Sequence, residues 1–142
     1  MQTIFPILRY HDARAAIRWL CKAFGFVEMF SVPEDGPYVR HARLRLGQNL
    51  IMVGWVRPED GIESPQTLGA ATQMLAVYVD DPDAHYDRSR AAGANILAGP
   101  YNTDFGSREY HVVDVEGHPW TFGTFQPALA EEEWDDVGEQ AG

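Results

Sequence analysis

The chain is poor in the residues that disulfide-linked or membrane-spanning folds need. It has a single cysteine, Cys21, which cannot form an internal disulfide and indicates a reducing, cytoplasmic setting. No apolar run approaches the roughly 20 residues of a membrane helix. No basic stretch followed by a long apolar one marks a secretory signal at the N-terminus. We therefore expect no membrane partner.

Several chemistry-bearing motifs are missing as well. There is no Ser-His-Asp arrangement and no cysteine metal cluster, and residues 101–104 contain no glycine for a phosphate cradle. Basic residues are scarce, at 11 against 21 acidic ones, and six of the acids lie between residues 131 and 139. The rest of the chain carries 11 basic and 15 acidic side chains, a net charge of −4. This balance argues against a nucleic-acid partner.

What the chain does contain is an internal repeat of about 68–70 residues. Each copy predicts a strand, a helix that a glycine ends, and three further strands. The predicted elements are strands 3–10, 26–32, 38–46 and 49–56 with helix 12–24, then strands 73–80 and 94–98 with helix 81–93 and a final hairpin. We divide the chain into a first module (1–57), a connector (58–71), a second module (72–126) and an acidic tail (127–142). The tail is interpreted as a solvated end, with a lid or partner-binding segment around Trp134 as the alternative.

The final hairpin, around the turn at residues 114–117, indicates which face of a module packs on a core and which faces a cavity. Trp120 and Phe122 share one face of its second strand, and Thr121 and Gly123 share the other. The first face needs a core, whereas the second mixes small and aromatic groups, as a cavity wall does. Alternation along each strand places the following residues on the face that would line a cavity, which we call the cup face: Phe5, Ile7, Met52, Gly54, Met74, Ala76, Tyr78, Thr121 and Gly123.

Two segments carry a family resemblance, LRYHDARAAI at residues 8–17 and DVEGHPW at residues 114–120. Together with the repeat they resemble the vicinal oxygen chelate superfamily, which includes glyoxalase I, extradiol dioxygenases, and the fosfomycin and bleomycin resistance proteins. The resemblance covers residues 3–126. It implies an α+β fold of tandem βαβββ modules whose mixed sheets form a cup, completed in a homodimer.

Catalytic members of that superfamily hold a divalent metal on four strands. Their ligand positions correspond here to Phe5, Met52, Met74 and Thr121. A Lewis-acid metal needs nitrogen or oxygen donors, and three of these side chains offer none. The resemblance therefore implies a metal-free protein with no cofactor and no catalytic residues, closest to the bleomycin resistance branch. We also expect Met74 to be buried, so that a carboxylate there would be costly.

The remaining polar candidates have structural alternatives. His41 alternates with Arg43 and Arg45 on one strand, which suits a solvated face, ligand recognition, or a metal ligand or general base. His111 is expected to pair with Glu109 on its own face. His11 and His85 are expected to be exposed, and His118 to bond locally in its turn.

Arg108 and Tyr110 lie on a strand whose equivalents point into the cup in relatives. Arg108 is therefore a candidate for gripping an anionic or carbonyl group, with an internal salt bridge as its alternative.

The sequence thus predicts a homodimer that sequesters a hydrophobic or aromatic small molecule, such as a drug or natural product, in its cups. The alternatives are a metal-dependent lyase, isomerase or dioxygenase with an unrecognised site, such as one at His41 and His111, and a paralogue whose cup serves only dimer packing. The predicted ligand-binding residues are Phe5, Ile7, His41, Arg43, Met52, Met74, Tyr78, Arg108, Tyr110 and Thr121.

Overall fold

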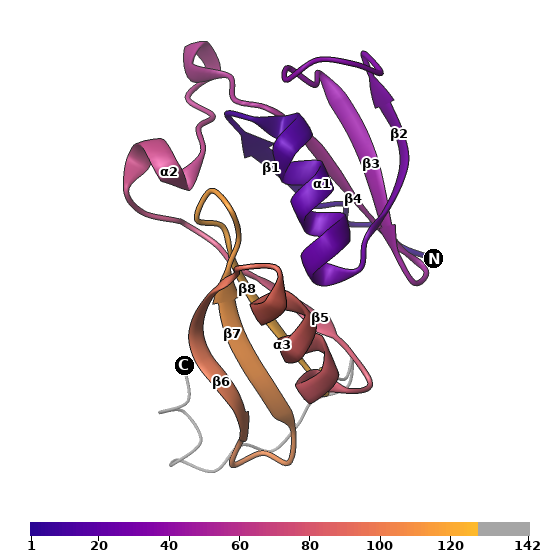
Figure 1. Ribbon diagram of the computed structural model, residues 1–142, viewed down its shortest axis with the longest axis vertical. Coiled ribbons are helices and arrows are strands. Elements are labelled where there is room, and N and C mark those ends of the chain that lie inside the picture. The colour runs from indigo at the N-terminus through magenta and orange to yellow at the C-terminus, as the bar shows by residue number, and fades with distance from the viewer. Residues whose placement is uncertain (128–142) are drawn as a thin grey trace.

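The computed structural model describes residues 1–127, so the predicted acidic tail, apart from Pro127, lies outside the described residues. Two modules follow one another along the chain (Figure 1). The first contains β1 (Ile7–Tyr10), α1 (Ala13–Phe24), β2 (Val27–Val32), β3 (His41–Leu46) and β4 (Asn49–Trp55). The second contains β5 (Leu75–Tyr78), α3 (Pro82–Ala91), β6 (Asn95–Asn102), β7 (Arg108–Val113) and β8 (Pro119–Gly123). The predicted α+β fold of tandem βαβββ modules is confirmed.

Helix α1 begins and ends where its capping residues predict. The Asp12 carboxylate accepts a hydrogen bond from the Ala15 amide at 3.0 Å, which satisfies a free donor of the first turn. Gly25 adopts a left-handed conformation with φ of 86° and ends the helix. An aspartate, Asp81, caps α3 in the same way.

Strand lengths differ from the prediction at two places. The strand predicted at residues 3–10 is paired only from Ile7, because Pro6 has no amide hydrogen to donate to a ladder. Strand β6 extends to Asn102, four residues beyond the predicted end, and shifts register twice along its pairing with β7. The connector also contains two short helical turns, η1 (Pro58–Asp60) and α2 (Pro65–Leu68), which were not predicted.

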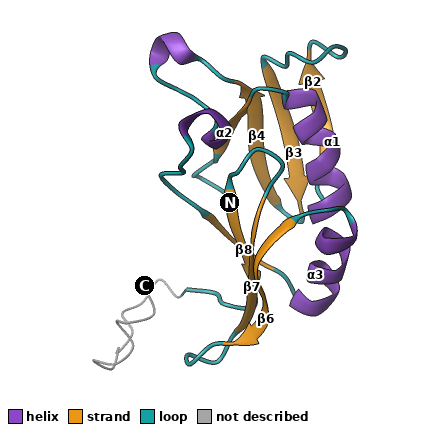
Figure 2. Ribbon diagram, turned by 60° about the vertical axis from the view of Figure 1, so that its left-hand side comes forward, coloured by secondary structure: helices purple, strands orange, loops and turns teal. Residues whose placement is uncertain are grey.

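Each module forms a four-stranded mixed sheet, in the order β1-β4-β3-β2 in the first and β5-β8-β7-β6 in the second. The first pair of each sheet is parallel and the other pairs are antiparallel. Helices α1 and α3 lie on the same side of the molecule, each covering one face of the sheet of its own module (Figure 2). We call the other face of each sheet its open face. No helix among residues 1–127 is long and apolar enough to cross a membrane.

The core lies between the helices and the sheets and runs through both modules. Phe24, at the end of α1, packs at a tilt against Phe122 of the second module with ring centroids 4.6 Å apart and edge-on against Trp120 at 5.3 Å. Arg88 of α3 donates hydrogen bonds to the carbonyls of Cys21 and Lys22 in the last turn of α1. The last turn of α1 is therefore joined to α3, and the open faces carry none of this packing.

Candidate functional site: the open sheet faces

The open face of the first sheet carries an apolar row with one cation in it. Register places Ile7 of β1 beside Met52 of β4, Met52 beside Arg43 of β3, and Arg43 beside Phe30 of β2. Ile7 is 50% exposed and Phe30 38% exposed. Such a surface buries apolar area when a ligand or another chain covers it.

Arg43 is held in place by its neighbours on this face. Its guanidinium carbon lies 4.9 Å from the centroid of the Phe30 ring, in a cation–π contact. Its Nε donates a hydrogen bond of 3.3 Å to Nε2 of His41, which is also packed edge-on against Phe30. His41 and Arg43 are thus brought together as predicted, although nothing tests their predicted role in ligand binding.

The open face of the second sheet carries a polar network. His111 of β7 faces Thr121 of β8, and its Nδ1 lies 2.7 Å from the Thr121 hydroxyl. Its Nε2 lies 2.8 Å from the hydroxyl of Tyr101 and 3.5 Å from Oε1 of Glu109. Tyr101 donates to the same Glu109 oxygen at 3.1 Å, and burial and this bond raise the pKa of the phenol. The predicted pairing of His111 with Glu109 is confirmed, and the network adds two hydroxyls to it.

The four positions that would hold the metal of the catalytic relatives do not form a metal site. Phe5 and Met74 lie just before β1 and β5, Met52 lies within β4, and Thr121 is 8% exposed on β8. Phenyl and thioether groups are not ligands for a hard divalent cation. Across residues 1–127, no group of three or more His, Cys, Asp or Glu side chains is placed to hold a metal ion. The residues present therefore do not fit the metal of the catalytic relatives.

Two predicted cup residues lie on the opposite side of the sheet. Tyr110 pairs with Phe122 on the helix-covered face and is fully buried. Arg108 shares that face, where it donates hydrogen bonds of 2.8 and 2.9 Å to both carboxylate oxygens of Asp83. These bonds hold the pKa of Asp83 below its usual value. The prediction that both residues point into the cup is wrong, and Arg108 makes the internal salt bridge considered as its alternative.

His85 is also placed differently from the prediction, because it is half-buried between the two helices. Its Nε2 donates to the Phe24 carbonyl at 3.0 Å, which leaves Nδ1 as an acceptor 2.5 Å from the Tyr110 hydroxyl. Its ring stacks on Phe122 with centroids 4.1 Å apart. Burial lowers the pKa of His85, and burial raises the pKa of Tyr110 to about 12. Both groups are therefore neutral near pH 7, as a packed interface requires.

Two acidic residues of the β7–β8 turn join the modules. Asp114 accepts hydrogen bonds from the Tyr10 hydroxyl at 2.6 Å and from Nε1 of Trp120 at 3.1 Å. Its other oxygen accepts from the amides of Glu116 and His118. All lone pairs of this buried carboxylate are used in holding the turn against β1, so Asp114 is a structural residue.

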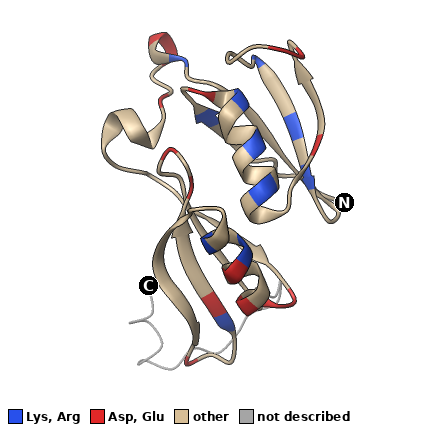
Figure 3. Cartoon of the chain, viewed as in Figure 1, with Lys and Arg blue, Asp and Glu red and all other residues tan. Residues whose placement is uncertain are grey.

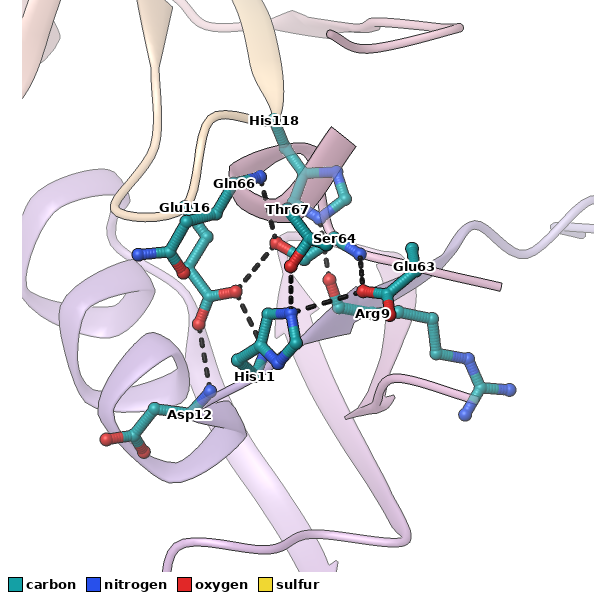
Figure 4. Close-up of polar contacts among 9 residues, drawn as sticks. All are labelled: Arg9, His11, Asp12, Glu63, Ser64, Gln66, Thr67, Glu116 and His118. Atoms are coloured by element: carbon teal, nitrogen blue, oxygen red, sulfur yellow. Dashed lines mark hydrogen bonds and ion pairs between the residues drawn. The ribbon is translucent and has the colours of Figure 1, made fainter. Parts of the chain in front are cut away.

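Glu116 makes the second part of this connection (Figure 4). Its carboxylate accepts from the amides of His11 and Asp12 at 2.8 and 2.9 Å and from the Ser64 hydroxyl at 2.7 Å. The His11 ring contacts Glu63 at 3.1 Å and also contacts Thr67. We call Tyr10, Asp114, Glu116 and Ser64 the inter-module latch.

A groove of about 650 Å³ lies between the modules, bounded by the β3–β4 hairpin on one side and β5 on the other. Apolar side chains such as Ile4, Leu50 and Val77 line it together with Tyr78. Tyr78 is the one predicted ligand-binding residue in its lining. Ile7, Arg43 and Met52 lie on the first open face instead, and Thr121 lies on the second.

Three residues of the open faces were missed in the sequence. Alternation had placed Arg9 on the same strand face as Ile7, but Arg9 was left out of the predicted ligand-binding residues. Phe30 follows a β-bulge between Glu28 and Phe30, which breaks the alternation along β2. Tyr101 lies in the part of β6 that was predicted as loop.

Comparison with known proteins gives the family. Residues 3–122 match the model of the glyoxalase/bleomycin resistance protein/dioxygenase superfamily. The uncharacterized protein Mb0911c of Mycobacterium bovis is 31% identical over 121 residues, which cover 83% of this chain and 80% of that protein.

Solved structures show the same architecture. TioX from Micromonospora sp. ML1 is 32% identical, with a TM-score of 0.69 over 91% of this chain and 100% of TioX. A glyoxalase-related enzyme from Fulvimarina pelagi shares the fold at 18% identity, with a TM-score of 0.62 over 88% of this chain and 89% of that one. The chain belongs to the glyoxalase/bleomycin resistance protein/dioxygenase superfamily.

Proposed function

We propose that this protein is a metal-free binding protein of the bleomycin-resistance type, which sequesters a hydrophobic or aromatic small molecule in the cytoplasm. The observation that carries the proposal is the chemistry of four positions. Phe5, Met52 and Met74 stand where catalytic relatives place metal ligands and supply apolar area instead of donors, and Thr121 at the fourth position offers only a hydroxyl bonded to His111. A drug or natural product that is toxic when free is the class of ligand that such sequestration suits.

A second copy of the chain is the proposed partner. Each open face has exposed apolar side chains among residues 1–127: Ile7, Met74 and Tyr78 are all at least 44% exposed. A cup needs two walls, and the two open faces of one chain lie on the same side of the molecule (Figure 2). Pairing each open face with one from a second copy would close the cups and cover the exposed side chains.

The alternative function is a metal-dependent lyase, isomerase or dioxygenase, and the polar network of the second open face favours it. His111 lies within reach of Thr121, Tyr101 and Glu109, an arrangement that could accept and release a proton. His111 and Glu109 alone supply too few donors for a metal, so a metalloenzyme would need further ligands from a second copy.

Metal content per subunit separates the two functions. Untagged protein is purified without chelators, incubated with zinc, nickel, manganese and ferrous ions, desalted and subjected to elemental analysis. We expect far less than one ion per subunit. A value near one would overturn the binding-protein proposal, and its loss in a His41→Ala or His111→Ala variant would identify the ligands.

A further inference from the structure

The open face of the first sheet carries three cations with no acidic partner. Arg9 lies on β1, and Arg43 and Arg45 lie two residues apart on β3 (Figure 3). Among residues 1–127, no carboxylate oxygen lies within 4.0 Å of their guanidinium nitrogens. By contrast, Arg57 and Arg108 are paired at 2.6 and 2.8 Å. In a chain of net charge −10 this face therefore has a local excess of positive charge.

The arginines are positioned by their surroundings. Position 54 is a glycine, and a Cβ built there would lie 2.9 Å from Nη1 of Arg9 and 2.8 Å from the Arg40 carbonyl. The missing side chain leaves room for the Arg9 guanidinium to lie across β4 and donate to the Trp55 carbonyl at 3.3 Å. The Arg45 guanidinium likewise donates a hydrogen bond to a backbone carbonyl, that of Gly47.

Arg43 is the member of the set best placed for a ligand. Its Nε is engaged by His41, and its guanidinium carbon is held over Phe30. Neither of its Nη atoms has a hydrogen-bond partner within residues 1–127. Two parallel N–H groups at the end of a fixed guanidinium match the two oxygens of a carboxylate or sulfonate. Met52 and Ile7 continue the same row as an apolar surface.

We propose that this face binds the anionic group of a planar aromatic ligand. Arg43 contacts the anionic oxygens, Arg9 and Arg45 contribute charge from either side, and the aromatic body lies on Met52 and Ile7. This inference rests on the proposed binding function and names the class of ligand for it. Positive charge on an apolar face favours an organic acid over a neutral or cationic compound.

Two fluorescent probes that differ by one charged group test it. 8-Anilinonaphthalene-1-sulfonate is anionic, and N-phenyl-1-naphthylamine is its uncharged counterpart without the sulfonate. Both are titrated into the full-length wild type and into Arg43→Met, which keeps an unbranched side chain and removes the charge. We expect Arg43→Met to weaken binding of the sulfonate about 10- to 100-fold, the loss of one or two charge-assisted hydrogen bonds. Binding of the neutral probe should change less than about 3-fold, since it lacks the group that Arg43 contacts.

Arg18→Met is the matched control, because Arg18 is exposed on α1 on the covered side of the sheet. It makes the same change in net charge and should leave the affinity for both probes unchanged. Thermal melts of both variants verify that they fold. Raising the salt concentration should weaken sulfonate binding to the wild type and leave the neutral probe unaffected.

The outcomes separate this inference from the function on which it rests. Equal affinity for both probes, with no effect of Arg43→Met, would overturn the anion site and leave the binding function standing. Equal losses of sulfonate affinity in Arg43→Met and Arg18→Met would also overturn the anion site, because they would show that the attraction to positive charge is non-specific. Failure of both probes to bind would overturn the binding function itself.

Discussion

The Tyr10 hydroxyl in the first module donates a 2.6 Å hydrogen bond to Asp114 in the second, and both side chains are buried. This bond joins residues 104 positions apart in the sequence. The same carboxylate oxygen accepts from Trp120, so one charge holds a strand of one module and the hairpin of the other. The orientation of the two modules depends on this contact and on its neighbour at Glu116.

Asp114→Ala should therefore destabilise the whole chain. It leaves the Tyr10 hydroxyl and the Trp120 indole N–H buried without acceptors, and each such donor costs about 1–3 kcal/mol. We expect a loss of at least about 3 kcal/mol in the free energy of unfolding, measured by urea denaturation. Asp104→Ala, at an exposed position in the β6–β7 loop, is the control and should stay within about 0.5 kcal/mol of wild type. Similar values for the two variants would contradict the latch.

Glu116→Gln tests the second half of the latch more gently. The amide keeps one oxygen acceptor, but the three donors at His11, Asp12 and Ser64 can no longer all be satisfied. A loss of about 1–3 kcal/mol is expected in the same denaturation experiment. Glu59→Gln changes a side chain that is 70% exposed and should have almost no effect. Equal losses in both would show that the net charge, and not the latch, is responsible.

The half-buried His85 should make stability sensitive to acid. Because its pKa is lowered in the folded state, the unfolded chain takes up a proton first as the pH falls below the usual histidine value of about 6.5. Stability should thus be fully present above that pH and decline below it. His85→Gln should flatten this decline between pH 6.5 and 4.5, as followed by urea midpoints, and His41→Gln serves as the control. An unchanged slope in His85→Gln would refute the assignment.

Met74→Glu probes the proposed partner. The expectation that Met74 is buried is wrong for the single chain, where it is 54% exposed, so a glutamate would cost little in an isolated subunit. If a second copy covers the open face, burying an unpaired carboxylate should weaken the dimer by at least about 10-fold. Sedimentation equilibrium gives the dissociation constant. Leu68→Glu, at an exposed position in the connector, should leave that constant unchanged.

The fold was predictable because its signals are local and repeated. Asp12 and Gly25 marked the ends of α1, and the alternation of Trp120 and Phe122 with Thr121 identified the covered and open faces of β8. The residues that join the modules were not predictable, since no local pattern shows that Asp114 meets Tyr10. The same limit applies to Arg108, whose partner Asp83 lies on a different element.

Tyr110 shows how a site residue was misplaced. Its neighbours Glu109 and His111 alternate with it, so the three cannot all share one face. The apolar pair Tyr110 and Val112 lies beside Phe122 and Trp120 in the strand register. Phe122 and Trp120 belong to the covered face, so Tyr110 and Val112 belong to it as well. Alternation carried across the hairpin would have given the right answer, whereas the resemblance to relatives gave the wrong one.

Because the helices and the aromatic core lie on one side of the sheets, the packing that stabilises this protein is physically separate from the proposed ligand-binding surface. Residues such as Ile7, Arg43 and Met52 can be exchanged without disturbing a contact that holds the fold together. A scaffold of this kind can acquire a new ligand by a few substitutions on two strands and still fold as before. If the proposed binding function holds, the ligands of such proteins should diverge faster than their architecture.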